Sequence, residues 1–242
     1  MQTPQIVFTL DTETTGLDTN VAEPVQIACT AFMFVDSERI SQSKIVFNSL
    51  CNPSVEIEEG AEDIHGISKD DVSMSPEPAV VAETVDLLIG QAETIGEVVI
   101  ATYNGSAFDL PLVQRFCPKI VTYPHVDVFS LVMREMPDKF GKLTEVYERY
   151  LGKRGLNAHD AAADCLMTSA ILRKYCEEKK VDPISVSEDL REPKAYKIFP
   201  FGKHAGKPIK QVPRSYVRWC LKNFDKISPD LKMTFETVLG KV

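Results

Sequence analysis

Residues 6–17, Ile6-Val7-Phe8-Thr9-Leu10-Asp11-Thr12-Glu13-Thr14-Thr15-Gly16-Leu17, join an apolar run to a pair of carboxylates. The apolar run predicts a buried β-strand that ends in the two acids. Because side chains alternate along a strand, Asp11 and Glu13 are expected on the same face. The stretch therefore predicts a strand that presents two acidic groups together. Taken alone, a cap at the end of a strand explains these acids equally well.

A second acidic segment, Tyr103-Asn104-Gly105-Ser106-Ala107-Phe108-Asp109, follows the strand-like residues 97–102. Its Asn-Gly pair predicts a turn before a helix that begins near Ala107. Asp109 is therefore expected in the first turn of that helix.

A third segment, His159-Asp160-Ala161-Ala162-Ala163-Asp164, opens a helix-forming stretch that continues to Tyr175. Its apolar residues follow helical spacing, which predicts His159 on the preceding loop and Asp164 inside the helix. Asp160 is adjacent and is a tempting metal ligand. A carboxylate at a helix start is favoured simply by the unpaired amides and the helix dipole, so we interpret Asp160 as a cap.

The four carboxylates and the histidine suit phosphoryl transfer. In-line cleavage of a phosphodiester requires stabilisation of the attacking and leaving oxygens, which two divalent cations about 4 Å apart provide. Such cations prefer oxygen ligands, and two Mg²⁺ ions offset the repulsion among Asp11, Glu13, Asp109 and Asp164. We expect two Mg²⁺ ions, with Mn²⁺ able to substitute. A histidine, with an ordinary pKa of about 6.5, suits removal of a proton from the attacking water, so His159 is the candidate base. A solvated loop cap is its alternative role.

The motifs Asp-x-Glu-x-Thr-Gly-Leu, Asn-x-x-x-Phe-Asp and His-x-x-x-x-Asp, in this order, resemble those of the Asp-Glu-Asp-Asp-His exonucleases of the ribonuclease H-like superfamily. The resemblance spans roughly residues 5–178. Residues 64–68, Ile-His-Gly-Ile-Ser, are also similar to a segment that this family commonly carries between its second and third strands. One departure is Tyr103, where many members carry a histidine.

This resemblance implies an α/β fold, a ribonuclease H-like mixed sheet flanked by helices. It implies that Asp11, Glu13 and Asp164 hold the catalytic metals. Asp109 would complete the site largely through water, with His159 as the general base. It also implies release of nucleoside 5′-monophosphates from a 3′ end.

The tail contains Phe199-Pro200-Phe201-Gly202-Lys203-His204-Ala205-Gly206-Lys207, followed by Val-Pro-x-x-Tyr-x-x-Trp at residues 212–219. It resembles the C-terminal module of the bacterial exodeoxyribonuclease X family. We therefore predict an exonuclease domain at residues 1–178, a linker at 179–195 and a small α+β module at 196–242. The linker is either extended or holds one short helix.

The glycines of the tail predict a tight turn that presents Lys203 and Lys207 to a nucleic-acid backbone, with a merely solvated hairpin as the alternative. The spacing does not match a nucleotide-binding phosphate loop. Trp219, the only tryptophan, is interpreted as the core anchor of the module rather than as a base-stacking platform.

The charge distribution is asymmetric. Residues 191–242 hold 12 lysines and arginines against 4 acids, a net charge of +8, whereas residues 1–190 hold 15 against 31, a net charge of -16. Such asymmetry indicates nucleic-acid contact, here by a basic tail whose binding weakens with salt.

The chain is expected to stay in the cytoplasm and away from membranes. No stretch of the sequence reaches the roughly 20 apolar residues of a membrane span, and the first five residues lack the features of a signal peptide. The six cysteines lack Cys-x-x-Cys spacing and occupy mostly apolar contexts, so we expect reduced, buried thiols without disulfides or zinc.

The pattern along the chain alternates strands and helices. Strands are expected near 5–11, 24–35, 40–50, 97–103 and 123–128. Helices are expected near 57–64, 78–95, 107–116, 128–135, 142–151 and 160–178. The tail is expected to form two short strands and helices near 213–223 and 229–239.

Four further residues are candidates for contact with the substrate: Thr14, Leu17, Asn104 and Phe108. Thr14 and Leu17 follow the first strand, where they could hold the terminal sugar and base. An aromatic such as Phe108 stacks on a base or sugar as readily as it fills a core, so turn and core packing is the alternative. His65 suits a structural hydrogen bond in its loop better than contact with the departing strand.

The leading hypothesis is an Mg²⁺-dependent 3′-to-5′ exonuclease acting on a DNA 3′ end, single-stranded or at a duplex terminus. Trimming of RNA is an alternative on the same fold, since none of the residues assigned above distinguishes a 2′-hydroxyl. Polymerase proofreading is another alternative on this fold. A non-catalytic nucleic-acid-binding protein is a third alternative, which the intact set of five residues disfavours.

Overall fold

The computed structural model describes residues 3–156, 159–224 and 227–241; the outermost residues of the predicted domains, 1–2 and 242, lie outside it. A mixed sheet forms its centre, with strand order β3-β2-β1-β5-β6 and β4 paired to β2. β1 runs antiparallel to β2 and parallel to β5, which is parallel to β6. The strands are β1 (Gln5–Thr14), β2 (Pro24–Asp36), β3 (Arg39–Ile40), β4 (Lys44–Leu50), β5 (Glu97–Thr102) and β6 (His125–Asp127). The predicted mixed sheet is confirmed.

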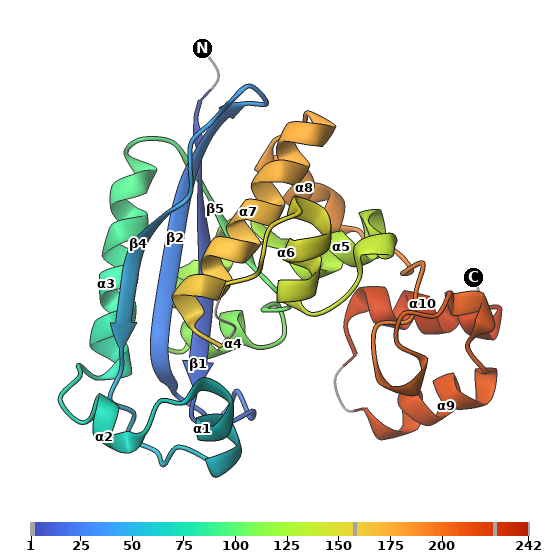
Figure 1. Ribbon diagram of the computed structural model, residues 1–242, viewed down its shortest axis with the longest axis horizontal. Helices are drawn as coiled ribbons and strands as arrows, with labels where there is room; N and C mark the ends of the chain where they lie inside the picture. The colour runs from blue at the N-terminus through green and yellow to red at the C-terminus, as the bar shows by residue number, and fades with distance from the viewer. Residues whose placement is uncertain (1–2, 157–158, 225–226, 242) are drawn as a thin grey trace.

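Helices cover both faces of the sheet and form the tail (Figure 1). They are α1 (Glu59–His65), α2 (Lys69–Val72), α3 (Pro78–Glu93), α4 (Asp109–Gln114), α5 (Val128–Glu135), α6 (Leu143–Leu151), α7 (Ala161–Lys179), α8 (Pro183–Arg191), α9 (Arg214–Asn223) and α10 (Pro229–Leu239). In Figure 1, α3 lies against one face of the sheet and α7 with α5 and α6 against the other. None of the helices in the described ranges is long and apolar enough to cross a membrane.

Alternation along β1 decides which face carries the acids. Ile6, Phe8 and Leu10 enter the apolar core shared with α3, whereas Val7 enters the core shared with α7. Asp11 and Glu13 continue the odd-numbered series, so they face α7. The sequence pattern of β1 thus delivers both carboxylates to the side where α7 begins.

The predicted linker contains α8, so the short-helix alternative is the one adopted. Asp182 caps this helix by accepting a hydrogen bond from the Ser185 amide, and the Gln5 side chain donates to the same carboxylate at 2.8 Å. The amide of Ile184 donates to the Gln5 side chain in return. The segment is therefore fastened to the start of β1.

The tail is more helical than predicted. The two expected short strands are reduced, within the described residues, to one antiparallel bridge between Ile198 and Pro208. Gly202 and Gly206 adopt positive φ angles of 62° and 76° and bend the intervening chain into a tight turn closed by a backbone hydrogen bond from Gly206 to Phe199. The sharp turn leaves too little extended chain for a hairpin.

The prediction that Trp219 anchors the module core is wrong. Trp219 is 52% exposed. Phe199 and Phe235 fill the core together with Val217 and Cys220, so α9 turns these two residues inward and Trp219 outward. All six cysteines of the chain are buried, as predicted.

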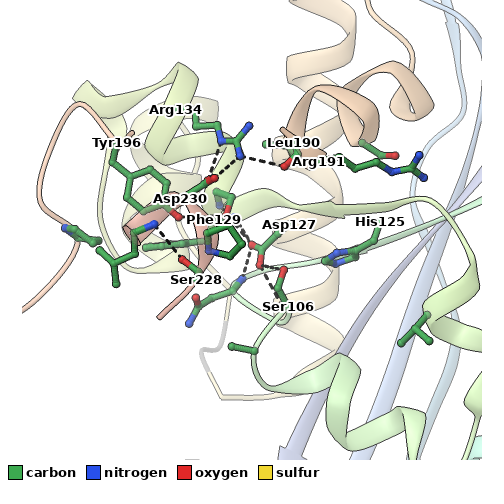
Figure 2. Close-up of a pocket in the computed structure, with 18 of the residues that line it drawn as sticks. Ser106, His125, Asp127, Phe129, Arg134, Leu190, Arg191, Tyr196, Ser228 and Asp230 are labelled. Atoms are coloured by element: carbon green, nitrogen blue, oxygen red, sulfur yellow. Dashed lines mark hydrogen bonds and ion pairs between the residues drawn. The ribbon is translucent and has the colours of Figure 1, made fainter. Parts of the chain in front are cut away.

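A buried ion pair joins the tail to the body (Figure 2). The Arg134 guanidinium, on α5, donates to both carboxylate oxygens of Asp230, on α10, at 2.8 and 2.5 Å. The same guanidinium donates to the backbone carbonyls of Asp189 and Leu190 in α8. Three helices therefore meet at one side chain.

Arg134→Ala should lower the free energy of unfolding by about 3–5 kcal/mol, because it leaves the Asp230 carboxylate buried without its partner. Urea denaturation monitored by circular dichroism measures the change. Replacing both partners, as in Arg134→Met with Asp230→Leu, should cost much less. A single substitution that costs under about 1 kcal/mol would show that the pair does not hold the tail.

Candidate active site

Three carboxylates converge where β1 meets α7. One carboxylate oxygen from each of Asp11, Glu13 and Asp164 lies within 4.8 Å of the others. The Oδ1 atom of Asp164 is buried and has no hydrogen-bond partner among the described residues. A buried oxygen without a donor is costly unless a cation satisfies it, so the donor set fits a divalent metal ion.

The start of α7 is positioned by β2. Gln26 stands opposite Glu13 in the β1–β2 register. Its side-chain oxygen accepts from the amide of Ala161, and its nitrogen donates to the Asp160 carboxylate, both at 3.3 Å. Asp160 in turn caps α7 by accepting from the Ala162 amide, as predicted for a helix cap. The strand that faces Glu13 therefore fixes the helix that carries Asp164.

Small side chains allow α7 to approach the sheet closely. Ala28 of β2, which pairs with Asp11, packs against Ala161, Ala162 and Cys165. Larger residues at these positions would hold the helix away from the strand. The close approach places Asp164 within reach of the carboxylates on β1.

Asp109 occupies the first turn of α4, as predicted, and is buried. Its Oδ1 accepts two hydrogen bonds from Thr12, one from the backbone amide at 3.1 Å and one from the hydroxyl at 2.7 Å. Its charge contributes to the raised pKa of Asp11. The fourth carboxylate therefore neighbours the cluster but is held by the residue between Asp11 and Glu13.

Gly105 allows the loop before α4 to approach Asp109. A Cβ atom at this position would lie 2.6 Å from the Thr102 side chain and 2.8 Å from Asp109 Oδ2, closer than real contacts allow. The preceding Asn104 has a positive φ of 62°, a conformation that asparagine tolerates. The Asn-Gly turn is thus required by the packing around the carboxylate.

Asp127 is a supporting residue that the sequence prediction missed. Its buried carboxylate accepts from the amides of Asn104 and Ser106 and from the Ser106 hydroxyl, and it caps α5 through the amides of Phe129 and Ser130. An aspartate between a predicted strand and a predicted helix was the available signal. It holds the loop that leads to Asp109.

Burial raises the pKa values of all four carboxyls, and repulsion by other members of the set adds to the shift for Asp11 and Glu13. Burial, then the charges of its acidic neighbours, raises the pKa of Glu13 to about 7. Burial raises the pKa of Asp109 to about 6, although hydrogen bonds from Thr12 oppose this shift. Burial also raises the pKa of Asp164 to about 6, and the pKa of Asp11 is held well above its usual range by burial and by its neighbours. A bound cation would reverse these shifts.

His159 lies on the exposed loop before α7, with a positive φ of 65°. His159 adjoins Asp164: its backbone donates a hydrogen bond to that carboxyl, and this bond and the histidine charge both lower the pKa of Asp164.

His65 makes a structural contact in its loop. The Ile67 amide donates to its Nδ1 at 3.0 Å, so its Nε2 carries the proton and donates to the Thr14 carbonyl.

A cavity of about 260 Å³ lies beside the carboxylates. Thr14, Leu17 and Phe108, three of the predicted substrate-contact residues, line it together with Glu13. Leu17 is 82% exposed, so its side chain is free to contact a ligand. The structure therefore brings these three candidates to one place.

The other substrate-contact candidates lie elsewhere. Asn104 lines a separate cavity of about 700 Å³ between the body and the tail, which Figure 2 shows. None of the residues Asp11, Glu13, Asp109 and Asp164 lines this cavity. Asn104 is exposed in its positive-φ turn, and its contact with the substrate stays a prediction. Lys203 and Lys207 are exposed on the tail and line neither cavity.

A family model described as Exonuclease (RNase_T) matches residues 8–172, which include every clustered carboxylate and His159. The chain belongs to this exonuclease family. Its substrate is accordingly nucleic acid, and the predicted enzyme class is confirmed. Enzymes of this kind use divalent metals, and the acidic cluster of this exonuclease can hold one.

The exonuclease is also similar to individual proteins. Exodeoxyribonuclease 10 of Escherichia coli (strain K12) is 23% identical over 241 residues, covering 95% of this chain and 97% of that protein. A structure of Exonuclease X in complex with 5′ overhanging duplex DNA has a TM-score of 0.55 and 22% identity, covering 75% of this chain and 98% of that one. E. coli Exonuclease I in complex with a dA16 oligonucleotide has a TM-score of 0.58 and 19% identity, covering 77% of this chain and 43% of that one. These structural likenesses confirm the predicted fold.

Mg²⁺ should raise the melting temperature more near pH 8 than near pH 5. The folded-state pKa values of Glu13, Asp109 and Asp164 exceed the ordinary values of 4.5 and 3.8. The metal-free protein therefore loses stability as the pH rises from about 4 to about 7, because the unfolded chain ionises first. Mg²⁺ binds the ionised carboxylates, so it offsets this loss only at the higher pH. Thermal melts with Mg²⁺ or EDTA test this, and an equal Mg²⁺ effect at both pH values would contradict it.

Thr12→Val should lower kcat about tenfold, because it removes the hydroxyl that orients Asp109 while keeping the side-chain shape. Thr12→Ser retains the hydroxyl and should retain most of the activity. Steady-state kinetics on a labelled oligonucleotide separate the two variants. Equal loss in both would show that packing of the threonine methyl group, rather than the hydrogen bond, matters.

Proposed function

We propose that this exonuclease is an Mg²⁺-dependent 3′-to-5′ exodeoxyribonuclease that releases nucleoside 5′-monophosphates by a two-metal mechanism. The observation that carries the proposal is the unpartnered Asp164 oxygen within a cluster of three carboxylates. Exodeoxyribonuclease 10, similar along nearly the whole chain, supports DNA as the substrate. The division into an exonuclease domain (1–178), a linker (179–195) and a basic tail (196–242) is part of this proposal, as is action in the cytoplasm.

In this proposal Asp11, Glu13 and Asp164 hold the metals, and Asp109 completes the set. Two Mg²⁺ ions, or Mn²⁺ in their place, would stabilise charge on the attacking and leaving oxygens. Asp109 keeps Thr12 and the end of β1 in register with α4 through its two hydrogen bonds. The protein contribution is chiefly a fixed arrangement of acidic oxygens.

His159 accepts the proton of the attacking water. Its exposed position lets it release that proton to solvent afterwards, and its place beside Asp164 brings it to the edge of the cluster. Leu17 and Phe108 hold the sugar and base of the terminal nucleotide in the cavity beside Glu13. Thr14 shapes the same wall, since its hydroxyl donates to the Gly16 carbonyl at 2.8 Å.

Lys203 and Lys207 contact substrate phosphates farther along the strand. Both are exposed on the basic tail. Asn104 lines the cavity between body and tail and contacts the substrate there. Phosphate contacts of this kind weaken as salt increases.

RNA is the second candidate substrate. The fold is also similar to a 3′-exonuclease whose structure is described as 3′-end specific recognition of a histone mRNA stem-loop, with a TM-score of 0.54 and 16% identity. DNA is preferred because the relative that matches over 95% of this chain is named an exodeoxyribonuclease.

Digestion of 5′-labelled single-stranded DNA, duplex DNA and RNA with Mg²⁺ should give a ladder that shortens from the 3′ end on DNA. Asp11→Ala should abolish the ladder, with a loss of at least about a thousandfold, because a metal ligand is removed. A circular dichroism spectrum confirms folding of the variant. Absence of a ladder on every substrate would refute nuclease function, and a ladder on RNA alone would establish the second candidate.

His159→Ala should lose about a hundredfold or more in kcat while retaining DNA affinity, because general base catalysis contributes about 10²–10⁴-fold. His65→Ala is the matched control, since it removes the other histidine of the region and a loop hydrogen bond rather than the proposed base. Wild-type turnover by the His159 variant would exclude it as the base.

A further inference from the structure

Trp219 presents an exposed ring that the fold of the tail does not use. Its residue is 52% exposed, and the tail core is filled by Phe199, Val217, Cys220 and Phe235. Burying this indole in the module would have removed a large apolar area from water, so its exposure costs folding free energy. A single exposed ring is common on protein surfaces, whereas exposed rings gathered in one patch indicate contact with another molecule.

Trp219 belongs to an ordered set of rings. Tyr216, one turn earlier on α9, lies with its ring centroid 5.9 Å from that of Trp219 and its plane only 15° away. Phe224 meets the Trp219 ring edge-on at 6.0 Å and supports it from the end of the helix. Tyr216 and Trp219 therefore form a stacked pair of nearly parallel rings, and Phe224 supports the Trp219 ring by an edge contact.

A cation borders this aromatic surface. The Lys203 ammonium lies 5.0 Å from the centroid of the Tyr216 ring, and His204 packs edge-on against the same ring at 4.6 Å. Lys203, His204, Tyr216 and Trp219 line one hollow of about 540 Å³, with Pro213 and Ser215. The glycine turn of the tail thus serves to bring Lys203 beside the rings.

The surrounding charge is positive and largely unpaired. Within the part of the chain that the structure describes, Lys203, Lys207, Arg218 and Lys222 form no ion pair. All four are exposed. The ligand that complements this surface combines flat rings with regularly spaced negative charges.

We propose that Tyr216 and Trp219 form a base-stacking platform for single-stranded DNA, with Lys203 on an adjacent phosphate. Stacking on aromatic rings beside a basic groove is the usual mode by which proteins bind single strands without reading their sequence. An acidic peptide would match the charge but not the parallel rings. The choice of DNA rests on the proposed function, and the platform adds to it a second strand-binding site outside the carboxylate cluster.

The single tryptophan makes the proposal directly measurable, because all tryptophan fluorescence of the chain comes from Trp219. The full chain is titrated in EDTA with a thymidine oligonucleotide of about 16 residues and with an abasic strand of equal length and charge. The thymidine strand should quench the fluorescence. The abasic strand should bind about tenfold more weakly and without quenching, since stacking typically contributes a factor of that size per base.

Variants separate stacking from charge. Anisotropy of a labelled thymidine strand should show a loss of about tenfold in affinity for Trp219→Ala and near wild-type affinity for Trp219→Phe, which keeps a flat ring. Leu221→Ala is the matched control, because it removes another exposed apolar side chain of α9 that does not line the hollow. Equal affinity in Trp219→Ala and the wild type, or binding without quenching, would overturn the platform.

The fluorescence titration tests the platform independently of catalysis. Quenching in EDTA, combined with no digestion of any substrate in Mg²⁺, would sustain the platform and refute the proposed function. Digestion of DNA without quenching would refute the platform and sustain the function. Equal quenching by abasic and thymidine strands would reduce the site to a charge contact and overturn stacking.

Discussion

The gathering of four carboxyl groups at a largely buried site is the constraint on which this structure depends. The pKa of Glu13 is raised to about 7, and those of Asp109 and Asp164 to about 6, because burial and like charge oppose ionisation. Groups that repel one another do not gather unless stronger packing holds them. Here two apolar cores, one on each face of the sheet, supply that packing. In the metal-free site the raised pKa values favour protonated carboxyls. A divalent cation would relieve the repulsion by binding the ionised carboxylates.

Most of the supporting contacts act on the backbone around the acids, and Thr12 alone among them donates to one of the four carboxylates. Gln26 holds the first amide of α7, Thr12 holds Asp109, and Asp127 holds the loop before α4. Ala28, together with alanines of α7, reduces the distance between helix and sheet. Each device leaves carboxylate oxygens available, most clearly the unpartnered oxygen of Asp164. The geometry of the site is therefore set by elements that do no chemistry.

The local sequence pattern predicted the strand and helix positions of the site carboxylates. It failed for contacts that depend on residues far apart in the sequence. Alternation along β1 placed Asp11 and Glu13 correctly, since neighbouring side chains need no tertiary information. The bonds between Thr12 and Asp109 and between Arg134 and Asp230 span 97 and 96 residues, so no local signal announces them. Trp219 was misplaced because α9 offers two apolar faces, and only Phe199 and Phe235, from other segments, select the one that turns inward. The two strands predicted in the tail do not form within its described residues, because Gly202 and Gly206 close the turn tightly.

Arg134 fixes the separation between the body and the tail. Its guanidinium holds α8 and α10 to α5 at once, so the segment between body and tail is a buried joint and not a flexible tether. A tether would let the tail reach strands of many lengths, with an effective concentration that falls as it lengthens. A joint sets one separation between the carboxylate cluster and any strand contact on the tail. For the strand contact that we propose on the tail, the shortest oligonucleotide able to occupy both sites is then a property of the fold.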